Sequence, residues 1–158
     1  MASQRSRARR VGVQITGEDN LRQLAEMLRP LAEQKVRIGM QGDAELAMIA
    51  GVHEYGSVKM NIPARSFIGT GKKKGQAAIG KLVRAGVTEI AHGRKSVESL
   101  FAEIGEVGLD RMVKNFNRIK EPSLSAHYAA HKTGPRKLLQ REEDLRESLT
   151  FDVVPKGE

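Results

Sequence analysis

The sequence contains no cysteine and no tryptophan among its 158 residues. The missing cysteine excludes disulfides, thiolate metal sites and thiol enzymes. Aromatic residues make up only 4% and hydrophobic residues 39%, so a single domain of this length has a lean core, which favours extra stabilisation by partner subunits. No apolar run approaches the roughly 20 residues that span a bilayer, and the N-terminus lacks the apolar stretch of a secretory signal. We therefore expect no membrane partner.

Acidic residues are fewer than basic ones. The sequence has 19 Asp and Glu and 27 Lys and Arg, which gives a net charge of +8. Such basicity indicates an anionic neighbour, either nucleic acid or an acidic protein surface. Many of the cations gather in a basic N-terminal arm (residues 1–10) and in a lysine cluster, namely Arg5, Arg7, Arg9, Arg10, Lys72, Lys73 and Lys74. They are either solvated loop charges or contacts to DNA phosphates, which basic clusters make without reading the base sequence.

Hydrophobic periodicity predicts that residues 11–158 form one domain of mixed strands and helices. Alternating apolar residues predict strands at residues 11–15, 36–40 and 149–153. Helical spacing of apolar residues predicts helices at about residues 16–31, 44–55, 76–91, 96–120, 123–131 and 142–148. Pro30 marks a kink or the approaching end of the first helix. The two long helices in the middle of the chain predict an antiparallel hairpin packed on the sheet.

Glycines, prolines and the lysine cluster interrupt the helical pattern over residues 56–74, which predicts a long loop. Loops of this length in small domains are usually functional or disordered. Gly56 is placed to end the preceding helix, because glycine accepts a left-handed conformation at little cost. Ser96 is placed to cap the second long helix.

Chemistry-bearing motifs are absent or incomplete. His127 and His131 have the i, i+4 spacing of metal ligands, but no supporting ligands accompany them, and His53-Glu54 does not extend into H-E-x-x-H. The glycines and lysines of residues 69–75 lack the order of a phosphate-binding loop. No nucleophile signature is present. We therefore expect no metal, no cofactor and no enzymatic activity, although a hydrolase with an unrecognised site stays open as a weak alternative.

The most distinctive stretch is residues 51–67, here called the motif segment, which combines G-V-H-E-Y-G-S with P-A-R-S-F. Its polar and aromatic residues stand beside residues that force turns. Pro63 stiffens an extended exit from the turn at Gly56. Arg65 can pair with a carboxylate in a forked geometry, and Glu54 is a candidate partner. Phe67 can anchor the segment on the core. We expect the motif segment to brace the long loop.

Three stretches together resemble a family of tailed-bacteriophage neck and tail proteins, which includes tail-completion and head–tail joining proteins. The resemblance rests on V-R-I-G-M at residues 36–40, on A-M-I-A-G-V-H-E-Y-G at residues 47–56 and on N-I-P-A-R-S-F at residues 61–67. Its motif residues are Glu54, Tyr55, Gly56, Pro63, Arg65 and Phe67. Ser66 stands where the family has proline. A final segment, residues 138–153, is similar at its apolar positions but lacks the family's Asp-Thr-Gly.

The resemblance implies an α+β subunit in which a small, largely antiparallel sheet carries helices on one face. It also implies a homo-oligomeric ring, typically a hexamer, assembled in the host bacterial cytoplasm and resident in the virion neck or tail. The implied neighbours are the head connector or stopper, the tail tube or tail terminator protein, and genomic DNA in the channel. The residues alone leave a rival open, which is a small sequence-nonspecific DNA-binding protein.

Overall fold

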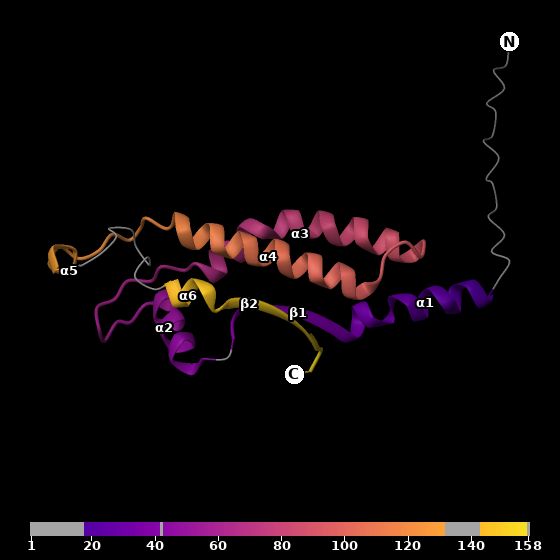
Figure 1. Cartoon of the computed structure of the whole chain (residues 1–158), viewed down its shortest axis with the longest axis horizontal. Helices are drawn as coiled ribbons and strands as arrows, with labels where there is room; N and C mark the ends of the chain where they lie inside the picture. The colour runs from indigo at the N-terminus through magenta and orange to yellow at the C-terminus, as the bar shows by residue number, and fades with distance from the viewer. Residues whose placement is uncertain (1–17, 42, 132–142, 158) are drawn as a thin grey trace, which may run out of the picture.

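A computed structural model describes residues 18–41, 43–131 and 143–157, and Figure 1 shows the arrangement of their elements. The elements in chain order are α1 (Glu18–Glu33), β1 (Gln34–Met40), α2 (Ala44–Tyr55), α3 (Ile68–Ala91), α4 (Val97–Arg118), α5 (Ala126–His131), α6 (Glu143–Glu147) and β2 (Leu149–Pro155). The fold is α+β, as predicted. No helix in this described part of the chain is both long enough and apolar enough to cross a bilayer.

The sheet of the described residues is an antiparallel pair, in which β1 lies beside β2 with Ile38 opposite Phe151. Both strands alternate apolar and polar residues, and the predictions at residues 36–40 and 149–153 are confirmed. The predicted strand at residues 11–15 lies outside the described residues. The sheet therefore joins a segment near the start of the domain to its last strand.

A hairpin of the two longest helices, α3 and α4, packs on the sheet, as predicted (Figure 1). Two glycines of α4 allow this helix to lie close to the sheet. A Cβ atom at Gly105 would overlap the ring of Phe151, and one at Gly108 would overlap the side chain of Ile38. Ser96 caps α4 as predicted, since its hydroxyl accepts a hydrogen bond of 3.1 Å from the Ser99 amide.

The buried side chains form two clusters at opposite ends of the hairpin (Figure 1). The first joins α2, α4, α6 and β2 and consists of Ala50, Phe67, Phe116, Leu145 and Leu149. The second lies where α1 meets the turn of the hairpin and consists of Ile90, Val97, Leu100 and Phe101. Phe67 packs edge to face on Phe116, with ring centroids 5.2 Å apart, so the predicted anchoring of the motif segment in the core is confirmed.

The prediction of a loop over residues 56–74 is wrong in its second half, because α3 already begins at Ile68. Lys72, Lys73 and Lys74 therefore lie on a helix. The neighbouring glycines are contact residues within the helix, not the turn residues that their composition predicts. Gly71 is buried so close to α4 that a Cβ would lie 2.9 Å from the Met112 Cα, and Gly75 packs on Arg111. The first helix contains Pro30 and ends three residues later at Glu33, in agreement with the predicted approach of its end.

Candidate functional site

The motif segment leaves α2 through a sharp turn at Gly56. Its φ of 75° lies in the left-handed region, and a Cβ there would stand 2.8 Å from the amide nitrogen of Ala64 and from the carbonyl oxygen of Ile62. The chain then forms a narrow loop that Ser57 and Ile62 close with two backbone hydrogen bonds of 2.8 and 2.9 Å. It returns along the end of α2, where the Arg65 amide donates to the His53 carbonyl at 2.6 Å.

Glu54, on the last turn of α2, caps the N-terminus of α3. Its carboxylate accepts hydrogen bonds from the Ser66 hydroxyl at 2.6 Å and from the backbone amides of residues 67, 68 and 69 at 2.9, 3.0 and 2.9 Å. These amides have no acceptor within the helix. The negative charge also interacts favourably with the positive end of the helix dipole. A Cβ at Gly69 would lie 2.7 Å from a carboxylate oxygen of Glu54, so a larger residue here would displace this side chain from its capping position.

Arg65 has a different partner from the predicted one. Its side chain is almost fully buried, and its guanidinium donates to two consecutive backbone carbonyls, those of Pro122 at 2.9 Å and Ser123 at 3.0 Å. The forked donors of the guanidinium thus find their acceptors in the segment that follows α4. The predicted Glu54–Arg65 pair is not formed, because the Glu54 carboxylate bonds to the start of α3 and the Arg65 guanidinium bonds to the segment after α4.

A buried asparagine completes this polar network. The side-chain amide of Asn115 on α4 donates to the Phe67 carbonyl at 2.9 Å and to the Thr70 hydroxyl, and its oxygen accepts from Lys74. Lys74, predicted as a DNA or partner contact, therefore bonds within the fold. The sequence analysis did not identify Asn115. The sequence pattern that marks Asn115 is a single amide side chain within an apolar helical stripe that includes Met112 and Phe116.

The other cations of α3 lie on its exposed face. Lys72, Lys73, Lys81 and Arg84 are exposed, and α3 contains no acidic residue before Glu89. The predicted arm residues Arg5, Arg7, Arg9 and Arg10 lie outside the described residues.

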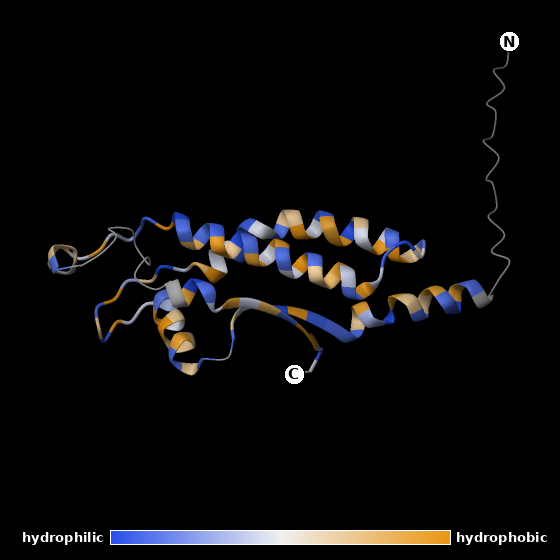
Figure 2. Ribbon diagram, viewed as in Figure 1, coloured by the Kyte–Doolittle hydropathy of each residue, from blue (hydrophilic) through white to orange (hydrophobic). Residues whose placement is uncertain are grey.

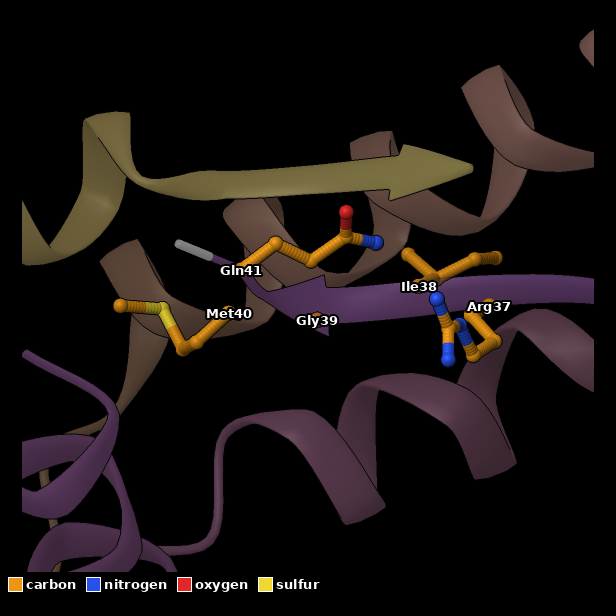
Figure 3. A pocket seen from close by; sticks show the side chains of 5 residues that line it. All are labelled: Arg37, Ile38, Gly39, Met40 and Gln41. Carbon is orange, nitrogen blue, oxygen red and sulfur yellow. The ribbon is translucent and has the colours of Figure 1, made fainter. Parts of the chain in front are cut away.

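A shallow pocket of about 660 Å³ runs along the end of β1 and is lined by Arg37, Ile38, Gly39, Met40 and Gln41 (Figure 3). Arg37 donates to the Asp152 carboxylate at 2.8 and 3.3 Å, and Gln41 donates to it at 2.8 Å. The hydrogen bond from Arg37 lowers the pKa of Asp152 below its usual value. Arg37 and Gln41, the polar side chains of this pocket, thus bond to Asp152 on the neighbouring strand and stabilise the sheet.

A second groove, of about 620 Å³, lies beside the narrow loop of the motif segment. Its walls include Tyr55, Val58, Pro63 and Leu124. Tyr55 and Pro63 are two of the predicted motif residues. The described residues contain no group of three or more His, Asp or Glu side chains arranged to hold a metal ion. Comparisons with protein-family models, with curated proteins and with solved structures find no match.

Proposed function

We propose that the chain is a non-catalytic structural subunit of a tailed-bacteriophage neck or tail. In this proposal it forms a homo-oligomeric ring, most simply a hexamer, that completes the tail and joins it to the head connector around the DNA channel. Assembly takes place in the host bacterial cytoplasm, and the ring resides in the virion. The neighbours are the connector or stopper on one side and the tail tube or terminator on the other.

The proposal rests on one observation: the polar residues of the motif segment make their hydrogen bonds within the fold. Glu54 caps α3 and Arg65 holds the segment after α4, so the residues that resemble the phage family serve to build a rigid support. A support of this kind suits an assembly subunit better than an enzyme, whose polar residues converge on a substrate.

Exposed apolar side chains provide independent support for self-assembly. Tyr55, Val58 and Met60 lie together on or next to the narrow loop, and each is largely exposed. Contiguous apolar patches on a protein surface commonly mark interaction sites. A lean core, with only 4% aromatic residues, is consistent with further burial between subunits.

Negative-stain imaging of the purified full chain tests the proposal. We expect closed rings with a central hole. Particles that are uniformly small, with no ring at any protein concentration, would contradict it.

The exposed basic face of α3 favours a second candidate, a small sequence-nonspecific DNA-binding protein. Lys72, Lys73, Lys81 and Arg84 present four cations on one helix with no carboxylate before Glu89. Such a face binds phosphates through counterion release, so binding weakens steeply as salt rises. A monomer or dimer that retards DNA in a gel at low salt, and loses this ability on Lys73→Glu with Lys81→Glu, would favour this candidate. Failure to retard DNA would eliminate it.

A further inference from the structure

One edge of β1 is without a neighbouring strand in the described part of the chain. β2 occupies the other edge, and just beyond the two strands the Lys156 amide donates to the Glu33 carbonyl at 2.7 Å. Bonded pairs alternate with non-bonded pairs along an antiparallel ladder, so every second residue of β1 bonds to β2. Counting from Glu33, the backbone N–H and C=O groups of Val36, Ile38 and Met40 therefore point away from β2. The described residues place no strand beside these groups, which are here called the open edge.

The pocket of about 660 Å³ follows this edge (Figure 3). Five consecutive residues, 37–41, line it. Successive side chains of a strand point to opposite faces, so a wall of consecutive residues lies along the edge of the strand rather than on one of its faces. The pocket therefore leaves room beside β1 for a further strand.

The helical hairpin is wider than the pair of strands that it covers. Axes of packed helices lie about 8–10 Å apart, whereas neighbouring strands lie about 4.8 Å apart. Ile79 of α3 lies near Ile38 of β1, since a Cβ at Gly108 would approach both side chains. Ile79, and Val83 one turn further along α3, are only half-buried. A strand added at the open edge, with its apolar residues toward the hairpin, would cover this side of α3.

Residues 11–15, which lie outside the described residues, have the sequence pattern that such a strand needs. The sequence V-G-V-Q-I alternates apolar and polar residues, so a strand formed by it has one apolar face to place against the hairpin. Its five residues fit along the seven residues of β1. The other two strands that periodicity predicts are β1 and β2, which already pair with each other. Residues 11–15 are therefore the predicted strand that still needs a partner.

The first helix keeps this segment away from the open edge of its own chain. α1 has 16 residues, so it is about 24 Å long, and it extends from the start of β1 away from the sheet (Figures 1 and 2). Residue 15 lies three residues before Glu18, the first residue of α1, and three residues span at most about 11 Å. Residue 15 therefore stays at least about 13 Å from the start of β1, whereas paired strands lie about 4.8 Å apart. The open edge within reach is that of another copy.

We infer that residues 11–15 of one copy pair with the open edge of β1 in the next copy. This inference rests on the proposed function, since it assumes a homo-oligomer and names a contact that joins its subunits. Backbone hydrogen bonds supply the affinity of such a contact, and the alternating apolar residues set its register. The segment leaves one copy beyond α1 and adds a third strand to the sheet of the next, so the contact is heterologous. A heterologous contact produces a ring where the rotation closes.

Two variants of the full chain test the inference. Val13→Pro removes a backbone donor from the middle of the segment and prevents its pairing as a strand. Val13→Asp with Ile15→Asp keeps every backbone donor but places charges on the apolar face. Ala8→Pro is the matched control, because it adds a proline to the same arm outside residues 11–15. Circular dichroism checks folding, light scattering gives the mass, and hydrogen exchange followed by mass spectrometry gives the protection of the β1 amides.

We expect both test variants to be folded monomers in which the open-edge amides of β1 exchange rapidly. The control should keep the mass and the protection of the wild type. A synthetic peptide with the sequence of residues 9–17, added to either monomeric variant, should protect β1 again, whereas the same peptide with Val13→Pro should not.

Folded test variants that keep the wild-type oligomer would overturn the inference and leave the proposed ring intact. A peptide of residues 9–17 that gives β1 no protection would show that the open edge does not accept this segment. A wild-type chain that is monomeric at every concentration would contradict the proposed function and the inference with it.

Discussion

At the scale of single residues, the Glu54 carboxylate determines how α2 and α3 are joined. It accepts four hydrogen bonds from the start of α3, although it lies 13 residues before the first of the amides that it caps. A backbone amide at the start of a helix that loses its acceptor and stays buried away from water raises the free energy of the folded state. Glu54 is thus a structural residue whose acidic character is required.

Replacement of Glu54 should destabilise the fold. We expect Glu54→Ala to lower the free energy of unfolding by about 2 kcal/mol, because several amides of α3 lose their acceptor. Glu45→Ala is the matched control, since Glu45 is exposed on the same helix and should change stability little. Urea denaturation followed by circular dichroism measures both. Equal stability of the two variants would contradict the capping role.

The Arg37–Asp152 ion pair makes a pH-dependent contribution between the strands. Because the hydrogen bond from Arg37 lowers the pKa of Asp152 in the folded state, its stabilisation is present above the unfolded pKa near 3.8 and is lost as the pH falls through the lower folded value. Both side chains are partly exposed, so the effect is small and sensitive to salt.

Comparison of the wild type with Asp152→Asn tests this contribution. We expect the variant to unfold at a lower urea concentration at neutral pH. The difference should shrink as the pH falls below about 4, where Asp152 of the unfolded chain is protonated first and the folded carboxylate at still lower pH. A difference that stays constant down to the lowest pH would show that the charge of Asp152 is not its cause.

At the scale of elements, glycines set the distance between the hairpin and the sheet. Gly105 and Gly108 on α4 leave room for Phe151 and Ile38, and Gly86 on α3 leaves room for Leu100. The long helices lie close because these positions lack side chains. Packing of this kind tolerates added volume poorly.

Two glycine substitutions should therefore have opposite effects. Gly105→Ala places a methyl group into the Phe151 ring and should destabilise the fold by about 1–3 kcal/mol. Gly80→Ala, on a part of α3 where the nearest atom is 4.0 Å away, should stabilise it by roughly 0.5–1 kcal/mol through the reduced freedom of the unfolded chain. Thermal melting distinguishes the two, and a stabilising Gly105→Ala would refute this packing.

Periodicity predicted most elements, because strands and helices with one buried face show it directly in the sequence. β1, α2, α4 and β2 follow their predicted ranges within a few residues. The start of α3 could not be predicted in the same way. Gly69 and Gly71 have the composition of a turn, and only their contacts with Glu54 and Met112 explain why they lie in a helix. Such contacts join distant parts of the chain and leave no local pattern.

At the scale of the whole molecule, the motif segment connects the core to the outer surface. Phe67 lies in the core, Arg65 fixes the segment after α4, and Val58 reaches solvent at the tip of the narrow loop. The sequence indicated a support role for this segment. It did not give the partners of Glu54 and Arg65, because both bind backbone groups whose positions depend on the complete fold.

Reversal of charge at Arg65 should abolish assembly. Arg65→Glu places a carboxylate beside two backbone carbonyls, which repel it, so the narrow loop loses its link to the segment after α4. We expect a chain whose helix content stays close to the wild type, since the segments that Arg65 joins lie outside α2, α3 and α4, but whose solution mass falls to that of a monomer. Circular dichroism and light scattering measure the two properties. Normal assembly of Arg65→Glu would show that the hydrogen bonds of Arg65 are not needed for the proposed ring.

The solution mass of the wild-type chain, measured by light scattering over a range of concentrations, tests the ring proposal most directly. A closed ring predicts one discrete species with a mass that is a fixed multiple of the 17.4 kDa chain, six copies for the expected hexamer, and no larger species as the concentration rises. A mass of one chain at every concentration, or a mass that grows without limit, would contradict it.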